Sequence, residues 1–376
     1  MRIAIHAADL DHARIDGTRV YLLNVLKKLG ELGVEDEFLI YHKGKFNPQL
    51  RPPQKDNYVF KSLGKFPAWT QTRLALELWR DKPDALWVPL HNLPRLRRQE
   101  MRTVVTIHDL AFKIFPQHFT AKDLFKLESL TDYAVKNADV IIAPSEATKR
   151  DILAFYPRLP KNKVRVVLHG FDPDLFQQEI SKEKLAGILS AFDLHLTPYV
   201  LYVGAIQPRK NLNVLVEAFE EVKKEKKDLK LVLAGAPAWK ARETLARIER
   251  SEFCKDIVVT GTVPFAELAA LYRGAAAFVF PSLYEGFGIP LLEAFASRTV
   301  AVCADNSSLR EVGADAALYF AATDAGELKE KLNEVLSDDN LRAQLIAKGE
   351  ERIKEFSWKK CAAGTLEAIR QAAQDV

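Results

Sequence analysis

Residues 277–295, AFVFPSLYEGFGIPLLEAF, contain the pattern from which the fold is inferred. The run opens with apolar residues that suit a buried strand. It continues through a Gly-Phe-Gly turn and places Pro290 where the first turn of a helix accepts proline. Glu285 therefore falls in a loop and Glu293 in the helix after it. A strand, a loop and a helix in this order form the repeating unit of a parallel sheet that helices cover.

The same alternation of short apolar runs with longer helical patterns extends through the chain. We expect strands within residues 2–7, 37–41, 85–89, 103–107, 139–144, 164–168, 199–204, 229–235, 256–261, 277–282 and 299–304. They predict two doubly wound α/β domains, 1–175 and 176–355, because Pro173 and the charged stretch after it interrupt the pattern. Residues 356–376 follow the second sheet and contain the pattern of an amphipathic helix.

The composition is that of a globular protein from a reducing compartment. The chain has 376 residues, of which 48% are hydrophobic, so it can bury two cores. No apolar run approaches the roughly 18 residues that span a bilayer. The opening MRIAIHAADL reaches acidic residues too early for a signal peptide. The three cysteines are widely separated and lack metal-ligand spacing, so the sequence predicts a cytoplasmic protein.

The net charge of +4 arises in the first half of the chain. The densest basic cluster consists of Arg95, Arg97, Arg98 and Arg102. A solvated face is the favoured interpretation, and a surface toward an anionic acceptor or the inner membrane face is the alternative. No basic motif is interleaved with aromatic residues, so we expect no nucleic acid partner.

Two loops carry the chemistry. In the first, Gly286 and Gly288 allow a ligand to approach the backbone, and the N–H groups of the following helix favour an anion such as phosphate. Glu285 and Glu293 can accept hydrogen bonds from hydroxyls, so a sugar joined to a phosphate would suit the loop. Alternatively, Glu285 is a solvated loop residue and Glu293 only complements the helix dipole.

The second loop lies in LYVGAIQPRKN, residues 201–211, and repeats the plan of strand, glycine, loop and helix. It places Arg209 and Lys210 directly before Asn211, which is a good N-cap residue. Paired cations at a helix start can hold a diphosphate. A basic surface pair is the alternative.

These motifs together resemble the retaining glycosyltransferases of family 4, which have the GT-B fold. The resemblance covers nearly the whole chain and includes DGTRVYLLNVLKKLGELG, TIHDLAF, APSEATKRDI, VLHGFD, VGAIQPRKN, residues 261–297, NSSLREVGADAALYF and FSWKK. It implies two Rossmann-like domains facing across a cleft, with the C-terminal helix of residues 356–376 crossing back onto the first domain.

The resemblance also implies roles for individual residues. Arg209 and Lys210 would hold the donor diphosphate and stabilise the charge of the leaving group. Glu285 would face the transferred sugar, and Glu293 would bind the nucleotide ribose. The backbone amides of Gly286, Phe287, Gly288 and Ile289 would line the sugar and phosphates. Two contacts would come from the first domain, with Gly17 in a loop over the diphosphate and His108 at the sugar.

The implied reaction is transfer of a hexose, with retention, from a nucleoside diphosphate sugar to a hydroxyl of a saccharide or lipid-linked saccharide. Mannose from GDP-mannose is favoured, because the motifs most resemble bacterial mannosyltransferases of surface polysaccharide synthesis. A UDP- or ADP-sugar donor and a noncatalytic nucleotide-sugar-binding subunit are the alternatives. We expect no metal and no cofactor, because Asp9–Asp11 and Asp172–Asp174 are D-x-D triplets outside the site.

Two positions depart from the family pattern. Asp16-Gly17 stands where the family has Gly-Gly. Arg298 stands where a glycine usually ends the helix, and a left-handed conformation there would cost about 1 kcal/mol for a non-glycine residue.

Overall fold

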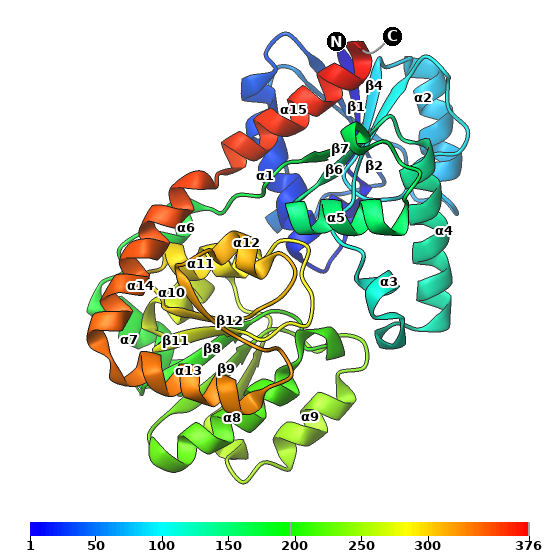
Figure 1. Cartoon of the computed structure of the whole chain (residues 1–376). Coiled ribbons are helices and arrows are strands. Elements are labelled where there is room, and N and C mark those ends of the chain that lie inside the picture. The colour runs from blue at the N-terminus through cyan, green and yellow to red at the C-terminus, as the bar shows by residue number, and fades with distance from the viewer. Residues whose placement is uncertain (196, 375–376) are drawn as a thin grey trace. The chain divides into compact units, whose positions relative to one another are not determined.

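The computed structural model describes residues 1–195 and 197–374, which form two units (Figure 1). The first unit contains Met1–Gly170 and the segment from Phe356 onward, and the second contains Phe171–Glu355. The units divide after Gly170, earlier than the predicted 175, because the short helix α6 (Pro173–Phe176) packs within the second unit. There the Phe176 ring meets the Tyr272 ring at 5.8 Å. The predicted segment 356–376 includes 375–376, which lie outside the described residues.

The first unit is built on a parallel sheet of seven strands in the order β3-β2-β1-β4-β5-β6-β7. The strands are β1 (Arg2–His6), β2 (Glu37–His42), β3 (Tyr58–Ser62), β4 (Ala85–Val88), β5 (Arg102–Thr106), β6 (Val140–Ala143) and β7 (Val164–Val166). Its helices of four residues or more are α1 (Gly17–Leu32), the π-helix Thr70–Leu74, α2 (Ala75–Asp81), α3 (Ala111–Ile114), α4 (Ala121–Asn137), α5 (Glu146–Phe155), α15 (Trp358–Gln374) and the 3-10 turn Ala8–Asp11.

Helix α15 completes the first unit from the far end of the sequence. Its buried residues recur at helical spacing and form one face that lies beside α1 and over β4, β5 and β6 (Figure 1). The chain before α6 approaches the start of α15 very closely, since a Cβ atom at Gly170 would lie 2.2 Å from the Trp358 nitrogen. Only glycine fits at position 170.

The second unit has a parallel sheet of six strands in the order β10-β9-β8-β11-β12-β13. The strands are β8 (Tyr199–Val203), β9 (Lys230–Ala234), β10 (Ile257–Gly261), β11 (Ala277–Phe280), β12 (Ala301–Ala304) and β13 (Ala317–Phe320). The other helices of this unit are α7 (Lys182–Ser190), α8 (Leu212–Glu225), α9 (Arg242–Glu249), α10 (Phe265–Gly274), α11 (Ile289–Ala296), α12 (Leu309–Gly313), α13 (Ala325–Ser337) and α14 (Asp339–Arg352).

All predicted strand runs form strands, and the parallel pairing is confirmed. The prediction missed β3 and β13, each of which lies at one of the two edges of its sheet and is only partly buried. An edge strand need not be a continuous apolar run, because one side of it has no neighbouring strand.

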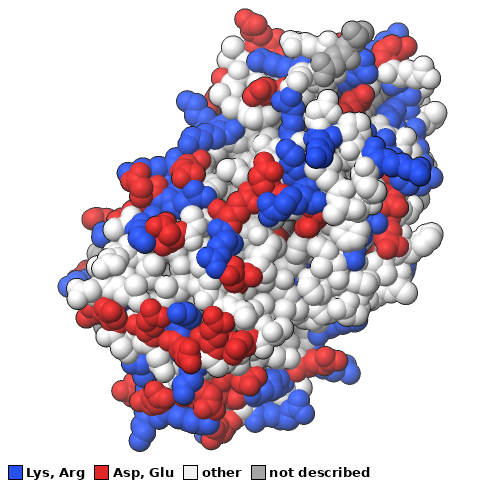
Figure 2. Space-filling view, in the orientation of Figure 1, with Lys and Arg blue, Asp and Glu red and all other residues white. Residues whose placement is uncertain are grey.

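The surface carries charges of both signs. Figure 2 shows Lys and Arg side chains interspersed with Asp and Glu over the visible face, and acidic side chains gather over α13. None of the helices in the described part of the chain is both long and apolar enough to cross a bilayer.

Candidate active site

The two predicted loops follow neighbouring strands at the centre of the second sheet. Strand β8 lies between β9 and β11, so the chain order reverses there. The loop with Arg209 and Lys210 follows β8, and the loop with Glu285 follows β11. In open parallel sheets this switch point at the carboxyl ends of the strands is where ligands bind.

The loop after β8 ends in a 3-10 turn, Pro208–Lys210, and Asn211 leads into α8. Asn211 stands at the N-cap position, but the expected side-chain cap is wrong. Its φ is 56°, and its amide donates instead to the carbonyls of Pro281 (3.1 Å) and Ala322 (2.6 Å). Asparagine tolerates this left-handed conformation. Asn211 therefore ties the loop after β8 to the loops after β11 and β13.

The loop after β11 ends at Gly288, which is the N-cap of α11. Its φ is 112°, and a Cβ atom would lie 2.9 Å from the Leu309 side chain, so the backbone requires glycine here. Ile289 is the first residue of α11, and Pro290 lies in its first turn as predicted. Gly286 and the buried Phe287 lie in the loop itself.

Arg209, Lys210 and Glu285 form one ionic cluster. Arg209 Nη1 lies 3.2 Å from Glu285 Oε2 and also donates to the Tyr284 carbonyl at 2.5 Å, and Lys210 Nζ pairs with Glu285 Oε1. Lys210 Nζ lies 5.5 Å above the Phe280 ring. All three charged side chains are about nine-tenths buried, and they carry one net positive charge.

The pKa of Glu285 reflects this cluster. Burial raises the pKa, but the charges of Lys210 and Arg209 outweigh it and bring the value to about 2. Glu285 is therefore ionised at any physiological pH. The net positive charge of the cluster still suits an anion, and the Glu285 carboxylate suits a neutral hydroxyl.

Glu293 has the opposite environment. It lies on α11, partly buried, and Tyr272 of α10 donates a hydrogen bond to it at 3.0 Å. Burial raises its pKa to about 7, the hydrogen bond from Tyr272 lowers it, and the charge of Asp172 raises it. The two carboxylates of this motif thus titrate far apart, as expected for groups with different tasks.

Gly17 and His108 belong to the first unit. Gly17 is the first residue of α1 rather than a loop residue, because Asp16 caps the helix by accepting from the Arg19 N–H. A Cβ atom at Gly17 would meet no protein atom within 4 Å, so packing within the unit does not require glycine there.

His108 follows β5, and its Nε2 lies 2.9 Å from the Pro89 carbonyl oxygen. Burial lowers the pKa of His108, so the ring is neutral at neutral pH. Because a carbonyl only accepts, Nε2 carries the proton and Nδ1 is an acceptor. The His108 ring and the Tyr21 ring of α1 lie nearly perpendicular to each other, with their centroids 4.8 Å apart. His108 can thus accept a hydrogen bond from a hydroxyl.

The arginine cluster of the sequence is largely engaged within the first unit. Arg97 donates to Tyr133 Oη and to the Asn137 carbonyl, both at 2.8 Å, and Arg95 lies 5.2 Å over the Tyr133 ring. The other two members pair with acidic neighbours, Arg98 with Glu100 and Arg102 with Asp139. All four arginines thus have contacts within the first unit.

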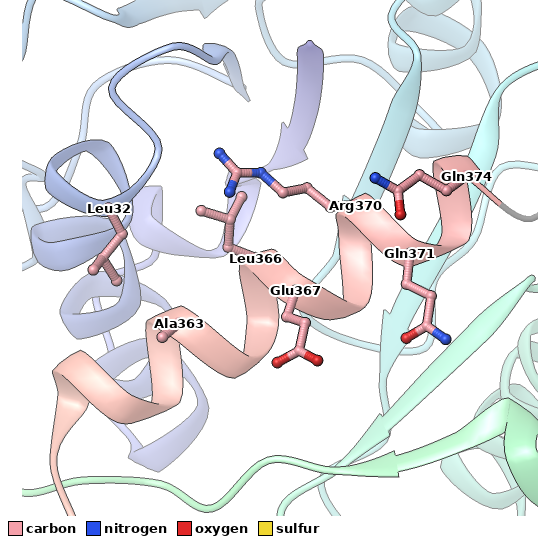
Figure 3. A pocket seen from close by; sticks show the side chains of 7 residues that line it. All are labelled: Leu32, Ala363, Leu366, Glu367, Arg370, Gln371 and Gln374. Atoms are coloured by element: carbon pink, nitrogen blue, oxygen red, sulfur yellow. The ribbon is translucent and has the colours of Figure 1, made fainter.

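A pocket of roughly 480 Å³ lies beside α15 in the first unit (Figure 3). It is lined by Leu32, Ala363, Leu366, Glu367, Arg370, Gln371 and Gln374. Arg370 pairs at 2.7 Å with Asp36, the residue before β2, so the pocket lies at the amino ends of the strands. The predicted site residues lie at the opposite, carboxyl ends, and we assign this pocket no part in the reaction.

One acidic residue of the predicted D-x-D triplets has structural partners within the first unit. Asp11, from the first D-x-D triplet, accepts from the backbone N–H groups of Lys43 and Gly44 at 2.7 Å. Among residues 1–195 and 197–374, no three His, Cys, Asp or Glu side chains come together as metal ligands would.

The sequence analysis assigned no role to two further elements of the site. One is Tyr272, whose position on α10 gave no sign of a contact with Glu293. The other is the short polar run Asn306–Ser308, which follows β12 at the carboxyl edge. Its position directly after a strand was a usable signal.

Comparison with known proteins covers both units. The family model described as Glycosyltransferase Family 4 matches residues 15–175, and the model described as Glycosyl transferases group 1 matches residues 195–352. O-antigen chain mannosyltransferase B of Escherichia coli is 27% identical over 95% of this chain and 96% of its own length. Alpha-maltose-1-phosphate synthase of Mycolicibacterium smegmatis is 32% identical over 64% of this chain and 65% of its own length.

Solved structures share the fold of the whole chain. Sucrose-phosphate synthase from Thermosynechococcus elongatus has a TM-score of 0.78 at 18% identity, with full coverage of both chains. HepE from Anabaena, in complex with UDP and glucose, has a TM-score of 0.76 at 15% identity over 98% of this chain and 99% of its own. With the two family models and two doubly wound parallel sheets, these matches show that the chain belongs to the family-4 glycosyltransferases of the GT-B fold.

Proposed function

We propose that this glycosyltransferase moves a hexose, with retention of configuration, from a nucleoside diphosphate sugar to a hydroxyl of a saccharide or lipid-linked saccharide. The observation that carries the proposal is the ionic cluster of Arg209, Lys210 and Glu285 at the switch point of the second sheet. Its net positive charge suits a diphosphate, and its carboxylate suits the hydroxyls of a sugar.

In the proposed reaction the bond between the anomeric carbon and the diphosphate oxygen breaks, and a bond from that carbon to the acceptor oxygen forms on the same face. The acceptor proton passes to the departing phosphate oxygen. Arg209 and Lys210 stabilise the charge that develops on the diphosphate. Fixed cations in a water-poor site can contribute several kcal/mol to that stabilisation. The proposal includes no metal and no cofactor.

The remaining predicted residues keep their implied roles as part of the proposal. Glu293 binds the ribose, Gly17 approaches the diphosphate, and Nδ1 of His108 accepts from a sugar hydroxyl. The backbone amides from Gly286 to Ile289 line the sugar and phosphates.

GDP-mannose is the favoured donor. The O-antigen mannosyltransferase is similar over nearly the entire length of both chains, which supports mannose. A UDP-sugar is the second candidate, because the structurally similar HepE was solved with UDP and glucose. An ADP-sugar remains the third.

A thermal-shift screen with GDP-mannose, UDP-glucose and ADP-glucose tests the donor. A ligand at one hundred times its Kd stabilises the folded protein by about 2.7 kcal/mol, which raises Tm measurably. We expect the largest rise with GDP-mannose, its loss in Lys210→Gln, and an unchanged rise in Lys184→Gln, a lysine exposed on α7. No rise with any of the three donors would refute the proposal, and a larger rise with UDP-glucose would change the donor.

The proposal includes peripheral contact of this cytoplasmic enzyme with the inner membrane face, where a lipid-linked acceptor would be presented. The engaged arginine cluster does not provide the surface. Residues 65–82 expose Phe66 (50%), Leu76 (45%) and Trp79 (46%), and the Arg73 guanidinium lies 5.0 Å from the Phe66 ring centroid. Exposed aromatic and basic residues together suit an anionic lipid surface.

Sedimentation with phosphatidylglycerol vesicles tests this contact. Trp79→Ala should reduce binding, whereas Phe125→Ala, which removes a 76% exposed ring from α4, should not. Equal sedimentation with phosphatidylcholine and phosphatidylglycerol vesicles, or no effect of Trp79→Ala, would reject residues 65–82 as the membrane surface.

A further inference from the structure

A third loop, which follows β12, is bonded to the loop that carries Glu285. The Glu285 N–H donates to Ser307 Oγ at 3.0 Å, and Ser307 Oγ donates to Asn306 Oδ1 at 2.9 Å. Asn306 Nδ2 in turn donates to the Ser282 carbonyl at 2.8 Å. Each group in this series fixes the donor and acceptor direction of the next, so the series has one orientation.

Ser308 holds the same loop from its carbonyl side. Its side chain is fully buried, and its Oγ lies 2.9 Å from the Glu285 carbonyl oxygen and 2.8 Å from that of Phe287. One hydroxyl proton is therefore shared between the two carbonyls on either side of Gly286. Together, Ser307 and Ser308 bind both the N–H and the C=O of Glu285.

Ser307 has a left-handed backbone, with φ at 43°. A non-glycine residue in this region is strained, and such strain persists where the surrounding structure fixes the residue, commonly at functional sites. Glycine would adopt the conformation freely but would lack the hydroxyl that binds Glu285. The chain thus has a strained residue at the place where a hydroxyl contacts the loop of the ionic cluster.

We propose that Asn306, Ser307 and Ser308 are positioning residues, which fix the backbone of Glu285 so that its carboxylate is held toward the transferred sugar. The role of Glu285 toward the sugar rests on the proposed function, whereas the hydrogen bonds that hold its backbone do not depend on that function. Arg209 and Lys210 hold the far end of the Glu285 side chain, and the loop after β12 holds its near end. Only both anchors together define where the carboxylate lies.

Replacement of Ser307 separates positioning from stability. Ser307→Ala loses the hydroxyl and keeps the strain, so its Tm should fall by about 2–4 °C. Ser307→Gly loses the hydroxyl and the strain together, so its Tm should stay within about 3 °C of wild type. If the hydroxyl positions Glu285, GDP release from GDP-mannose should slow in both variants alike, on the order of tenfold to a hundredfold.

Arg298→Gly is the matched control. Arg298 also has a left-handed backbone, with φ at 60°, but lies at the end of α11 and pairs with Glu350 at 3.2 Å. The same relief of strain should raise its Tm by about 2–4 °C and leave turnover within twofold of wild type.

Hydrogen exchange of the ligand-free protein gives a readout that needs no donor. Exchange within residues 281–289 should be faster in Ser307→Gly and Ser308→Ala than in Arg298→Gly. Wild-type exchange there in both serine variants would overturn the proposal, as would faster exchange with full turnover. If the wild type turns over none of the donors, the proposed function fails, and hydrogen exchange alone decides whether the loop after β12 braces the loop of Glu285.

Discussion

The two glutamates of residues 285–293 should change stability in opposite directions when each is replaced by glutamine. Glu285 has a pKa of about 2, below the ordinary 4.5, and the difference corresponds to about 3 kcal/mol of stabilisation of the folded state at neutral pH. Its replacement also leaves two buried cations without their carboxylate. We therefore expect Glu285→Gln to lower the free energy of unfolding by about 3 kcal/mol at pH 8.

Glu293→Gln should do the reverse at the same pH. The pKa of Glu293 is about 7 in the folded protein, so its charge costs stability once the pH exceeds that value. The stability that protonated Glu293 contributes is complete below about pH 4.5 and is lost as the pH rises through 7. Glutamine resembles the protonated acid, so the variant should exceed wild type by about 2–3 kcal/mol at pH 8 and match it near pH 4.5.

Urea unfolding followed by circular dichroism at pH 5 and pH 8 measures both effects. The stability that Glu285 contributes persists down to about pH 4.5 and is lost only as the pH falls toward 2. Glu285→Gln should therefore have a lower free energy of unfolding than wild type at both pH 5 and pH 8. A Glu285→Gln protein as stable as wild type, or a Glu293→Gln protein less stable than wild type at pH 8, would refute the electrostatic argument.

Three further outcomes are expected. Glu293→Gln should weaken binding of free GDP on the order of tenfold to a hundredfold in calorimetry, whereas Glu285→Gln should spare GDP affinity and cut turnover; equal losses of affinity would contradict these roles. Donor turnover should survive EDTA, because Arg209 and Lys210 supply the positive charge, and activity that EDTA abolishes and magnesium restores would overturn this. Tyr272→Phe should raise the pKa of Glu293 further, so the stability difference from a Tyr272→Phe, Glu293→Gln double variant should level off at a higher pH, and at a larger value, than in the parent pair; Tyr199→Phe, which removes a hydroxyl bonded to the Leu271 carbonyl, should not move the pH of that plateau.

The fold was predictable from sequence because its central strands are buried on both faces. Such strands are continuous apolar runs, as in residues 277–280 and 199–203, and they stand out against the helices between them. Two edge strands lack this signal: Tyr58–Ser62 and Ala317–Phe320 mix buried and partly exposed positions. The other edge strands, Val164–Val166 and Ile257–Gly261, are also only partly buried but contain β-branched runs, and they were predicted. Arg298, which stands where the family pattern has a glycine, adopts the left-handed conformation whose cost the sequence analysis considered.

The site was predictable only where its residues lie in the two motifs. Lys210 and Glu285 are 75 positions apart, and only the adjacency of β8 and β11 brings their charges together. The contact of Tyr272 with Glu293 depends on how α10 packs beside α11, which periodicity does not specify. Asn211 lies at the predicted N-cap position, but its side chain does not cap α8, because its amide donates to carbonyls of other loops.

Helix α15 has a consequence for how the protein is made. The first unit includes residues on both sides of the second, so some 185 residues, Phe171–Glu355, are synthesised before α15 exists. At about 5–20 residues per second this takes roughly 10–40 seconds. During that interval the apolar surface of α1 and β4–β6 that α15 later covers is open to other chains, while the uninterrupted second unit can already fold. The nascent first unit is thus the part of the protein most dependent on chaperones, and conditions that slow translation between residues 171 and 355 should increase its aggregation.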